Sequence, residues 1–99
     1  MRYEAKVVVV TGGSRGIGEG CARVFTQAGS RVVICGPGEN DGTALAAELT
    51  DRGPGEAHYL KCDVNSTADI QNLIDSTVAR YGGIDCLINN AGWHPPHRP

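Results

Sequence analysis

The stretch Val7-Val8-Val9-Val10-Thr11-Gly12-Gly13-Ser14-Arg15-Gly16-Ile17-Gly18 decides the fold of this 99-residue chain. Four consecutive β-branched residues are apolar on both faces, which predicts a strand buried on both sides within a parallel sheet. A helix is expected from Gly16 to Ala28, because apolar residues recur there at helical spacing. The residues expected on its buried face are Ile17, Cys21, Val24, Phe25 and Ala28.

The turn between this strand and this helix has the chemistry of an anion site. Its backbone N–H groups have no helical partners, and the helix dipole adds about half a positive charge there. Gly12 permits a sharp exit from the strand, Gly16 lets a diphosphate approach the backbone, and Gly18 lets the helix lie close to the sheet. The spacing G-x-x-x-G-x-G is not the commoner dinucleotide fingerprint, so a tight turn without a ligand is the alternative.

Composition and length are typical of one small soluble domain, with 40% hydrophobic residues, 20% charged residues and a formal net charge of −2. Basic residues are scattered singly, so no nucleic-acid partner is expected. No apolar run approaches the roughly 20 residues of a membrane span, so no membrane partner is expected either. The four cysteines form no C-x-x-C pair, which favours reduced thiols and a cytoplasmic location.

Strands and helices alternate along the chain. Strands are expected at 6–10, 31–35, 57–61 and 84–88, and residues 93–99 are expected to be loop. The second helix is expected to start from Asn40 or Asp41 and to bury Ala44, Leu45 and Leu49. The third follows a capping-box-like sequence, Ser66-Thr67-Ala68-Asp69, and its expected apolar face is Ile70, Leu73, Ile74, Thr77 and Val78.

This β-α-β-α-β-α-β order predicts an α/β fold, a doubly wound Rossmann-type parallel sheet with strand order 3-2-1-4. The ligand crevice of such a sheet lies at the carboxyl ends of its strands, beside the point where the strand order reverses. Three loops are expected to meet there: 12–18, 62–64 and 89–92.

With the 11–18 motif, Asp63-Val64 and Asn89-Asn90-Ala91-Gly92 all present, the chain resembles the short-chain dehydrogenase/reductase family over essentially its whole length. Within that family it is most similar to 17β-hydroxysteroid dehydrogenases. The resemblance implies a nicotinamide dinucleotide, NAD or NADP, and an oxidoreductase that oxidises a secondary alcohol of a hydroxysteroid or a sugar by hydride transfer. It also implies a homo-oligomer, a tetramer, for a full-length protein.

The resemblance also implies which positions contact the cofactor. They are Gly12, Arg15, Gly16, Ile17, Gly18, Asp63, Val64, Asn90, Ala91 and Gly92. Asp63 would accept a hydrogen bond from the adenine amino group, and Asn90 would contact the ribose side of the adenosine. The alternatives without a ligand are that Asp63 is a solvated carboxylate at the end of a strand and that Asn90 only forms a turn.

The choice between NAD and NADP stays open. Family members that prefer NAD end the second strand with Asp, and here that position is Gly36. Glu39 in the same loop is a possible substitute, although it also suits the first turn of a helix. Arg15 has the geometry to pair with a ribose 2′-phosphate.

The catalytic motif of the family, Tyr-x-x-x-Lys, does not occur. The residues four positions after Tyr3, Tyr59 and Tyr81 are Val7, Asp63 and Asp85, so no catalytic residue is assigned. The chain is therefore expected to be the N-terminal cofactor-binding part, 1–99, of a single Rossmann-type domain, inactive alone and marginally stable because its fourth strand is an open edge.

Two alternatives to an oxidoreductase remain open at this stage. The chain would be an inactive product that binds nucleotide or competes for assembly, or it would have a methyltransferase-like doubly wound fold. The pair His94 and His97 gives a weak metal pattern without a third ligand, so no metal is expected. His94 either lines a substrate pocket or lies in a solvent loop.

Overall fold

The structure, a computed structural model, describes residues 5–12, 16–36, 38–63 and 65–89. Its strands are β1 (Val7–Thr11), β2 (Arg31–Gly36), β3 (Glu56–Lys61) and β4 (Cys86–Asn89). Its helices are α1 (Gly16–Gln27), α2 (Glu39–Arg52) and α3 (Thr67–Tyr81). The predicted alternation of strands and helices is confirmed, with most boundaries within two residues.

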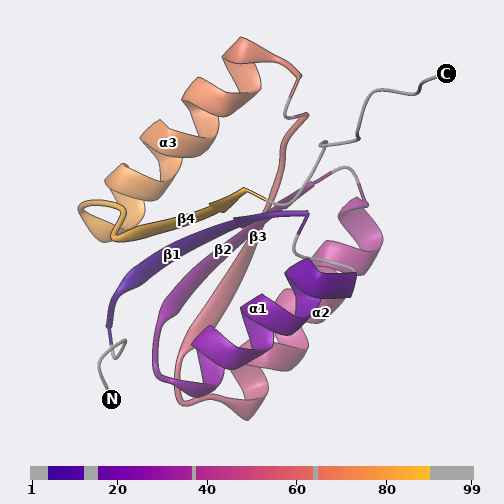
Figure 1. Ribbon diagram of the computed structural model, residues 1–99, viewed down its shortest axis with the longest axis vertical. Coiled ribbons are helices and arrows are strands. Elements are labelled where there is room, and N and C mark those ends of the chain that lie inside the picture. The colour runs from indigo at the N-terminus through magenta and orange to yellow at the C-terminus, as the bar shows by residue number, and fades with distance from the viewer. Residues whose placement is uncertain (1–4, 13–15, 37, 64, 90–99) are drawn as a thin grey trace, which may run out of the picture.

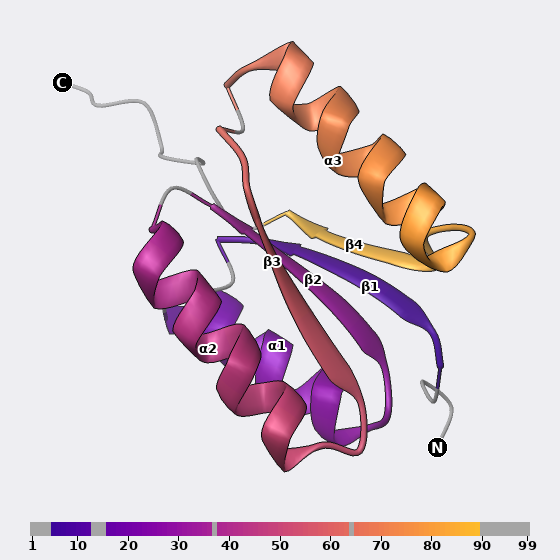
Figure 2. The same ribbon diagram turned by 180° about the vertical axis from the view of Figure 1, so that it is seen from behind.

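The four strands form one parallel sheet in the order β3-β2-β1-β4, as predicted. Helices α1 and α2 cover one face of the sheet and α3 covers the other (Figures 1 and 2). This arrangement explains the valine run, because each face of β1 has its own core. Val8 and Val10 pack with the α1–α2 layer, and Val9 packs with the α3 layer.

Helix α1 confirms only part of the predicted buried face: Ala28, just after the helix, is buried, and Cys21 and Phe25 are half-buried against the core. The buried residues within α1 are Gly18, Ala22 and Thr26, whereas Ile17 and Val24 are 77% and 62% exposed. Small side chains allow the helix axis to approach the sheet closely, and this contact selects the small stripe over the larger apolar one. Gly29 then ends the helix with a φ of 90°, which confirms the expected left-handed cap.

Helix α2 begins at Glu39, earlier than the predicted Asn40 or Asp41, and its N-cap Gly38 makes no side-chain capping bond. Leu45 and Leu49 are buried as predicted, but Ala44 is exposed and Ala46 is buried in its place. The buried face of α2 also includes Gly42, which lies against Tyr59 of β3.

Helix α3 has the predicted cap: the Ser66 side chain accepts a hydrogen bond from the backbone N–H of Asp69. Leu73 and Thr77 are buried, whereas Ile74 and Val78, expected on the same face, are 40% and 44% exposed. The helix therefore has more apolar surface than the four described strands cover.

Strand β4 begins at Cys86 and not at the predicted Ile84. The Asp85 carboxylate accepts a hydrogen bond from the backbone N–H of Val7 at 2.8 Å, and the Asp85 N–H donates to Val7 O at 2.8 Å. The Asp85 carboxylate thus accepts the hydrogen bond from the Val7 N–H that a backbone carbonyl of a longer strand would otherwise accept.

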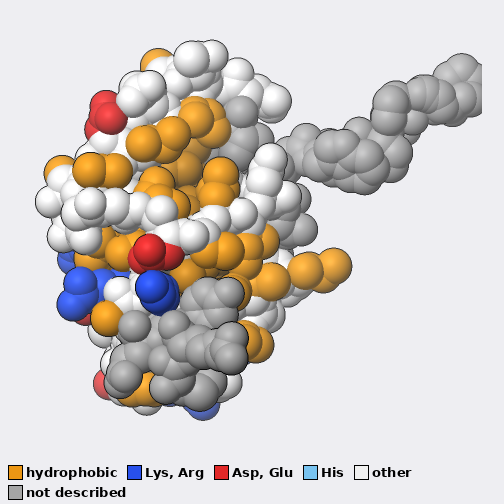
Figure 3. Space-filling view, turned by 60° about the vertical axis from the view of Figure 1, so that its left-hand side comes forward, with side chains coloured by type: hydrophobic (Ala, Val, Ile, Leu, Met, Phe, Trp, Pro, Cys, Tyr) orange, Lys and Arg blue, Asp and Glu red, His pale blue; other side chains and the backbone are white. Residues whose placement is uncertain are grey.

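Within the described residues β4 is an edge strand, as predicted. Leu87 on β4 is 61% exposed, and a cavity of about 320 Å³ opens between it, Ile74 and Asn89. Figure 3 brings this side of the molecule forward and shows hydrophobic side chains gathered there. None of the described helices has the length and apolar character that crossing a membrane requires.

Candidate functional site

The turn from β1 into α1 has the backbone conformation that the sequence predicts. Gly12 and Gly16 have φ values of 70° and 57°, in the left-handed region that disfavours side chains. A Cβ added at Gly16 would meet no described atom within 4 Å, so open space lies above the start of the helix. An anion is favoured at such a helix N-terminus.

The two outer glycines of this motif have different roles. The Gly12 N–H donates to Cys35 O at 2.7 Å, so this amide continues the β1–β2 ladder and Gly12 contributes its conformation. Gly18 is buried within α1, where a larger side chain would separate the helix from the sheet. Ile17 is exposed beside them. Arg15 lies outside the described residues.

The carboxyl ends of β1 and β4 are joined by side chains. The Thr11 hydroxyl lies 3.0 Å from Asn89 Oδ1 and 3.3 Å from Ile88 O, both of which are acceptors. This contact fixes the start of the Asn89–Gly92 motif next to the glycine turn. Asn90, Ala91, Gly92 and His94 lie outside the described residues, so their predicted roles stay predictions.

At the end of β2, the Tyr59 hydroxyl donates a hydrogen bond to Gly36 O. The Tyr59 ring lies against Gly42 of α2, where an added Cβ would come within 2.2 Å of a ring carbon. Burial, and then the negative charge of Glu39, raise the pKa of Tyr59, so it remains a hydroxyl donor. Tyr59 therefore braces the end of β2 at Gly36.

Asp63, at the end of β3, is held by the start of α3. Its Oδ1 accepts from the Asn65 N–H at 2.9 Å, and its own N–H donates to Asp69 Oδ2 at 2.8 Å. Its carboxylate is exposed at the edge where the strands end. These two hydrogen bonds fix the position of Asp63 at this edge, and its predicted contact with adenine stays a prediction. Val64 lies outside the described residues.

Two buried cysteine thiols lie near this edge, on the α3 side of the sheet. Cys35 and Cys62 are 0% and 1% exposed and belong to the α3-side core. Burial, with Cys62 beside it, raises the pKa of Cys35 to about 12, and burial also raises the pKa of Cys62. Both are therefore protonated packing residues and unreactive as nucleophiles.

Parallel pairing brings the described candidates to one edge of the sheet, where the strands end (Figure 1). Gly12, Gly36, Asp63 and Asn89 all lie there. Reasoning from sequence assigned no role in the site to Thr11, Tyr59 or Asp69. Of these three, only Asp69 could have been found from the sequence, through its place in the capping box. Among the described residues, no three or more metal-ligating side chains lie together.

Comparison with known proteins agrees with this geometry. Residues 6–98 match the family model described as short chain dehydrogenase. The chain is similar to L-fucose dehydrogenase from Oryctolagus cuniculus, with 51% identity over 98 residues, 99% of this chain and 33% of that protein. It is 45% identical to Tropinone reductase-like 1 from Erythroxylum coca over 91 residues, 92% of this chain and 32% of that protein.

Among solved structures, a short chain dehydrogenase from Mycobacterium smegmatis superposes with a TM-score of 0.85 at 38% identity, covering 92% of this chain and 38% of that chain. The match decides against a methyltransferase-like fold. The chain spans about a third of the length of the curated relatives it matches.

Proposed function

The chain belongs to the short chain dehydrogenase family, and on that premise we propose that residues 1–99 are the cofactor-binding part of a single Rossmann-type domain in an NAD(P)-dependent oxidoreductase. The observation that carries the proposal is the open space above Gly16, at the positive end of α1, where the strand order of the sheet reverses. An anionic diphosphate suits this place.

The proposed contacts follow the edge of the sheet. The turn 12–18 would hold the diphosphate through the backbone at Gly16, Ile17 and Gly18. Asp63 would accept from the adenine amino group, next to Val64. Asn90, with Ala91 and Gly92, would lie along the adenosine and nicotinamide side. The bonds that hold Asp63 and the Thr11–Asn89 contact support this assignment.

The proposed reaction is hydride transfer from a secondary alcohol, with the bound nicotinamide as hydride acceptor. The relatives named L-fucose dehydrogenase favour a sugar-like alcohol, and the sequence resemblance to type-fourteen 17β-hydroxysteroid dehydrogenase favours a hydroxysteroid. His94 would line the substrate side. Since no Tyr-x-x-x-Lys occurs in these 99 residues, this chain supplies binding and orientation in the proposal.

Between NAD and NADP, the residues support either cofactor. Gly36 offers no carboxylate to the ribose hydroxyls, and its carbonyl is engaged by Tyr59. Glu39, exposed in the first turn of α2, is the acid nearest in sequence. Arg15 would favour the 2′-phosphate of NADP.

A second proposal is a nucleotide-binding product without turnover, which competes for assembly with a longer protein. This sequence contains no Tyr-x-x-x-Lys motif, so in this second proposal the 99 residues act through the dinucleotide site alone. Both proposals share the dinucleotide site, so binding tests them together and turnover of a secondary alcohol separates them.

The test is a titration of the 99-residue chain with NADH and with NADPH, monitored by the fluorescence of its one tryptophan, Trp93. Saturable binding of at least one dinucleotide is expected, and the ratio of the two affinities gives the cofactor preference. Gly20→Ala, an exposed position of α1 with open space around it, is the control that should bind normally. Equal and unsaturable responses to both dinucleotides would overturn the proposal.

A further inference from the structure

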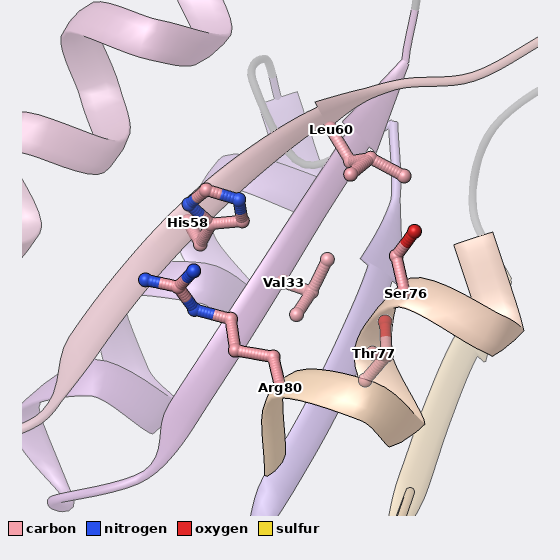
Figure 4. Close-up of a pocket in the computed structure, with 6 residues that line it drawn as sticks. All are labelled: Val33, His58, Leu60, Ser76, Thr77 and Arg80. Atoms are coloured by element: carbon pink, nitrogen blue, oxygen red, sulfur yellow. The ribbon is translucent and has the colours of Figure 1, made fainter. Parts of the chain in front are cut away.

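A second cavity lies on the α3 face of the sheet, between β3 and the carboxyl half of α3 and away from the ends of the strands (Figure 4). We call it the β3–α3 cleft, and its volume is about 240 Å³. Its lining residues are Val33, His58, Leu60, Ser76, Thr77 and Arg80.

The floor of the β3–α3 cleft is apolar. Val33 and His58 are partners in the β2–β3 register, and Leu60 lies two residues further along β3 on the same face. Leu60 and His58 remain half-buried because α3 directs its buried Leu73 toward the core under β1 and β2. The cleft is therefore a part of the sheet face that α3 leaves partly open.

One rim of the β3–α3 cleft is basic. Figure 4 shows the Arg80 guanidinium next to the His58 ring, on the same side of the cavity. Burial first, and then the positive charge of Arg80, lower the pKa of His58, while Glu56 acts weakly in the opposite direction. The Arg80 guanidinium and the His58 imidazole both carry N–H donors at this rim, and the described residues that line the cleft include no acidic side chain.

The neighbouring charges leave this rim with an excess of cations. The Tyr81 hydroxyl donates to Glu56 Oε2 at 2.6 Å and accepts from Arg80 Nε at 3.2 Å. Arg31 lies 5.7 Å from the centroid of the Tyr81 ring. No carboxylate of the described residues lies within ion-pair distance of Arg80. Glu56, the acid that acts on His58, thus accepts a hydrogen bond from Tyr81, and Arg31 and Arg80 both lie over the Tyr81 ring.

We propose that the β3–α3 cleft binds a small organic carboxylate, with its anionic group between His58 and Arg80 and its apolar part over Val33 and Leu60. The size is adequate, since apolar cavities of about 150 Å³ already hold benzene. A guanidinium and an imidazole N–H are matched to carboxylate oxygens, and hydrogen bonds to a charged group are the stronger kind. The site is separate from the proposed dinucleotide site and does not depend on it.

The experiment is an NMR titration of the 99-residue chain with benzoate, without dinucleotide. His58→Gln identifies the His58 ring signal among the three histidines. Benzoate should raise the pKa of His58, because an anion stabilises the imidazolium, and should shift the methyl signals of Val33 and Leu60. Arg80→Gln should weaken benzoate binding about tenfold. Arg52→Gln, an exposed arginine of α2, is the matched control and should bind benzoate normally.

Two further ligands complete the test. Benzamide has nearly the same shape without the charge, and inorganic phosphate has charge without the apolar ring; both should bind about tenfold more weakly than benzoate. Equal binding of benzamide or phosphate would overturn the proposal, as would equal losses in Arg80→Gln and Arg52→Gln. So would an unchanged His58 signal in a chain whose circular dichroism shows that it is folded.

Discussion

The Asp69 carboxylate accepts a hydrogen bond from the backbone N–H of Asp63 at 2.8 Å. In the capping box that the sequence suggests, the acid returns to the N–H of the cap residue, here Ser66. Ser66 N–H instead donates to Asp63 O at 2.9 Å. The first turn of α3 thereby holds the backbone of Asp63 through both its N–H and its carbonyl.

Asp69→Ala should therefore weaken the adenosine end of the proposed site. The variant leaves the Asp63 N–H without its acceptor, and we expect a stability loss of about 1 kcal/mol. It should also lower the affinity for NADH several-fold but leave that for reduced nicotinamide mononucleotide, which has no adenosine, unchanged. Asp75→Asn is the control, because this carboxylate accepts from Gln71 on the same helix. Equal losses of affinity for NADH and for reduced nicotinamide mononucleotide would contradict a role of Asp69 at the adenosine end.

Gly42 is expected to tolerate no side chain. A Cβ there would lie 2.2 Å from Cδ1 of the Tyr59 ring, so Gly42→Ala should destabilise the chain by about 1–3 kcal/mol through overpacking. Gly20→Ala meets open space in α1 and should instead stabilise it by about 0.5–1 kcal/mol, because alanine favours helix. Urea unfolding monitored by circular dichroism compares the two. Changes of the same sign would show that the Tyr59 contact does not limit this position.

The exposed edge at β4 should cause self-association. Leu87 is 61% exposed on an unpaired strand of the described sheet, and Leu87→Lys adds a charge there that disfavours edge-to-edge pairing. We expect sedimentation velocity to shift toward monomer in this variant. Val24→Lys makes the same change at a 62% exposed position of α1 and should leave the association unchanged. An equal shift in both variants would point to net charge as the cause.

The contact of Arg23 with Glu48 predicts a pH dependence. The Arg23 guanidinium, 2.9 Å from the Glu48 carboxylate, lowers the pKa of Glu48 from its ordinary value of 4.5, mainly through the hydrogen bond. A folded-state pKa below the unfolded one adds stability above pH 4.5 that is lost as the pH falls through the folded value.

Because this pair is exposed, the effect should be small. The Tm of the parent should fall more steeply between about pH 6 and about pH 3 than that of Glu48→Gln. Asp51→Asn, which also removes one carboxylate from α2, is the control and should follow the parent. Parallel curves for the parent and Glu48→Gln would contradict the prediction.

Arg15→Ala tests the cofactor preference. If this guanidinium pairs with the 2′-phosphate, the variant should lose about tenfold in affinity for NADPH and little for NADH. The tryptophan titration measures both. Arg52→Ala removes the same charge from the far end of α2 and should alter neither affinity; equal losses in Arg15→Ala would refute the pairing.

Much of the fold is predictable from the sequence for local reasons. The valine run has no polar face, so it requires cover on both sides, and the glycines after it and after each helix require positive φ. The buried stripe of α1 was not predictable from spacing alone. Two stripes fit the helical period, and only contact with the sheet selects Gly18, Ala22 and Thr26 over Ile17 and Val24.

The sequence by itself determined the order of the strands and the edge at which Gly12, Gly36, Asp63 and Asn89 meet, because parallel pairing with right-handed crossovers leaves few other arrangements. Only the tertiary structure decided which side chains brace that edge. Tyr59 reaches Gly36 across 23 residues, and Thr11 reaches Asn89 across 78. Such bonds depend on the register of neighbouring strands and on rotamers, which no local pattern encodes.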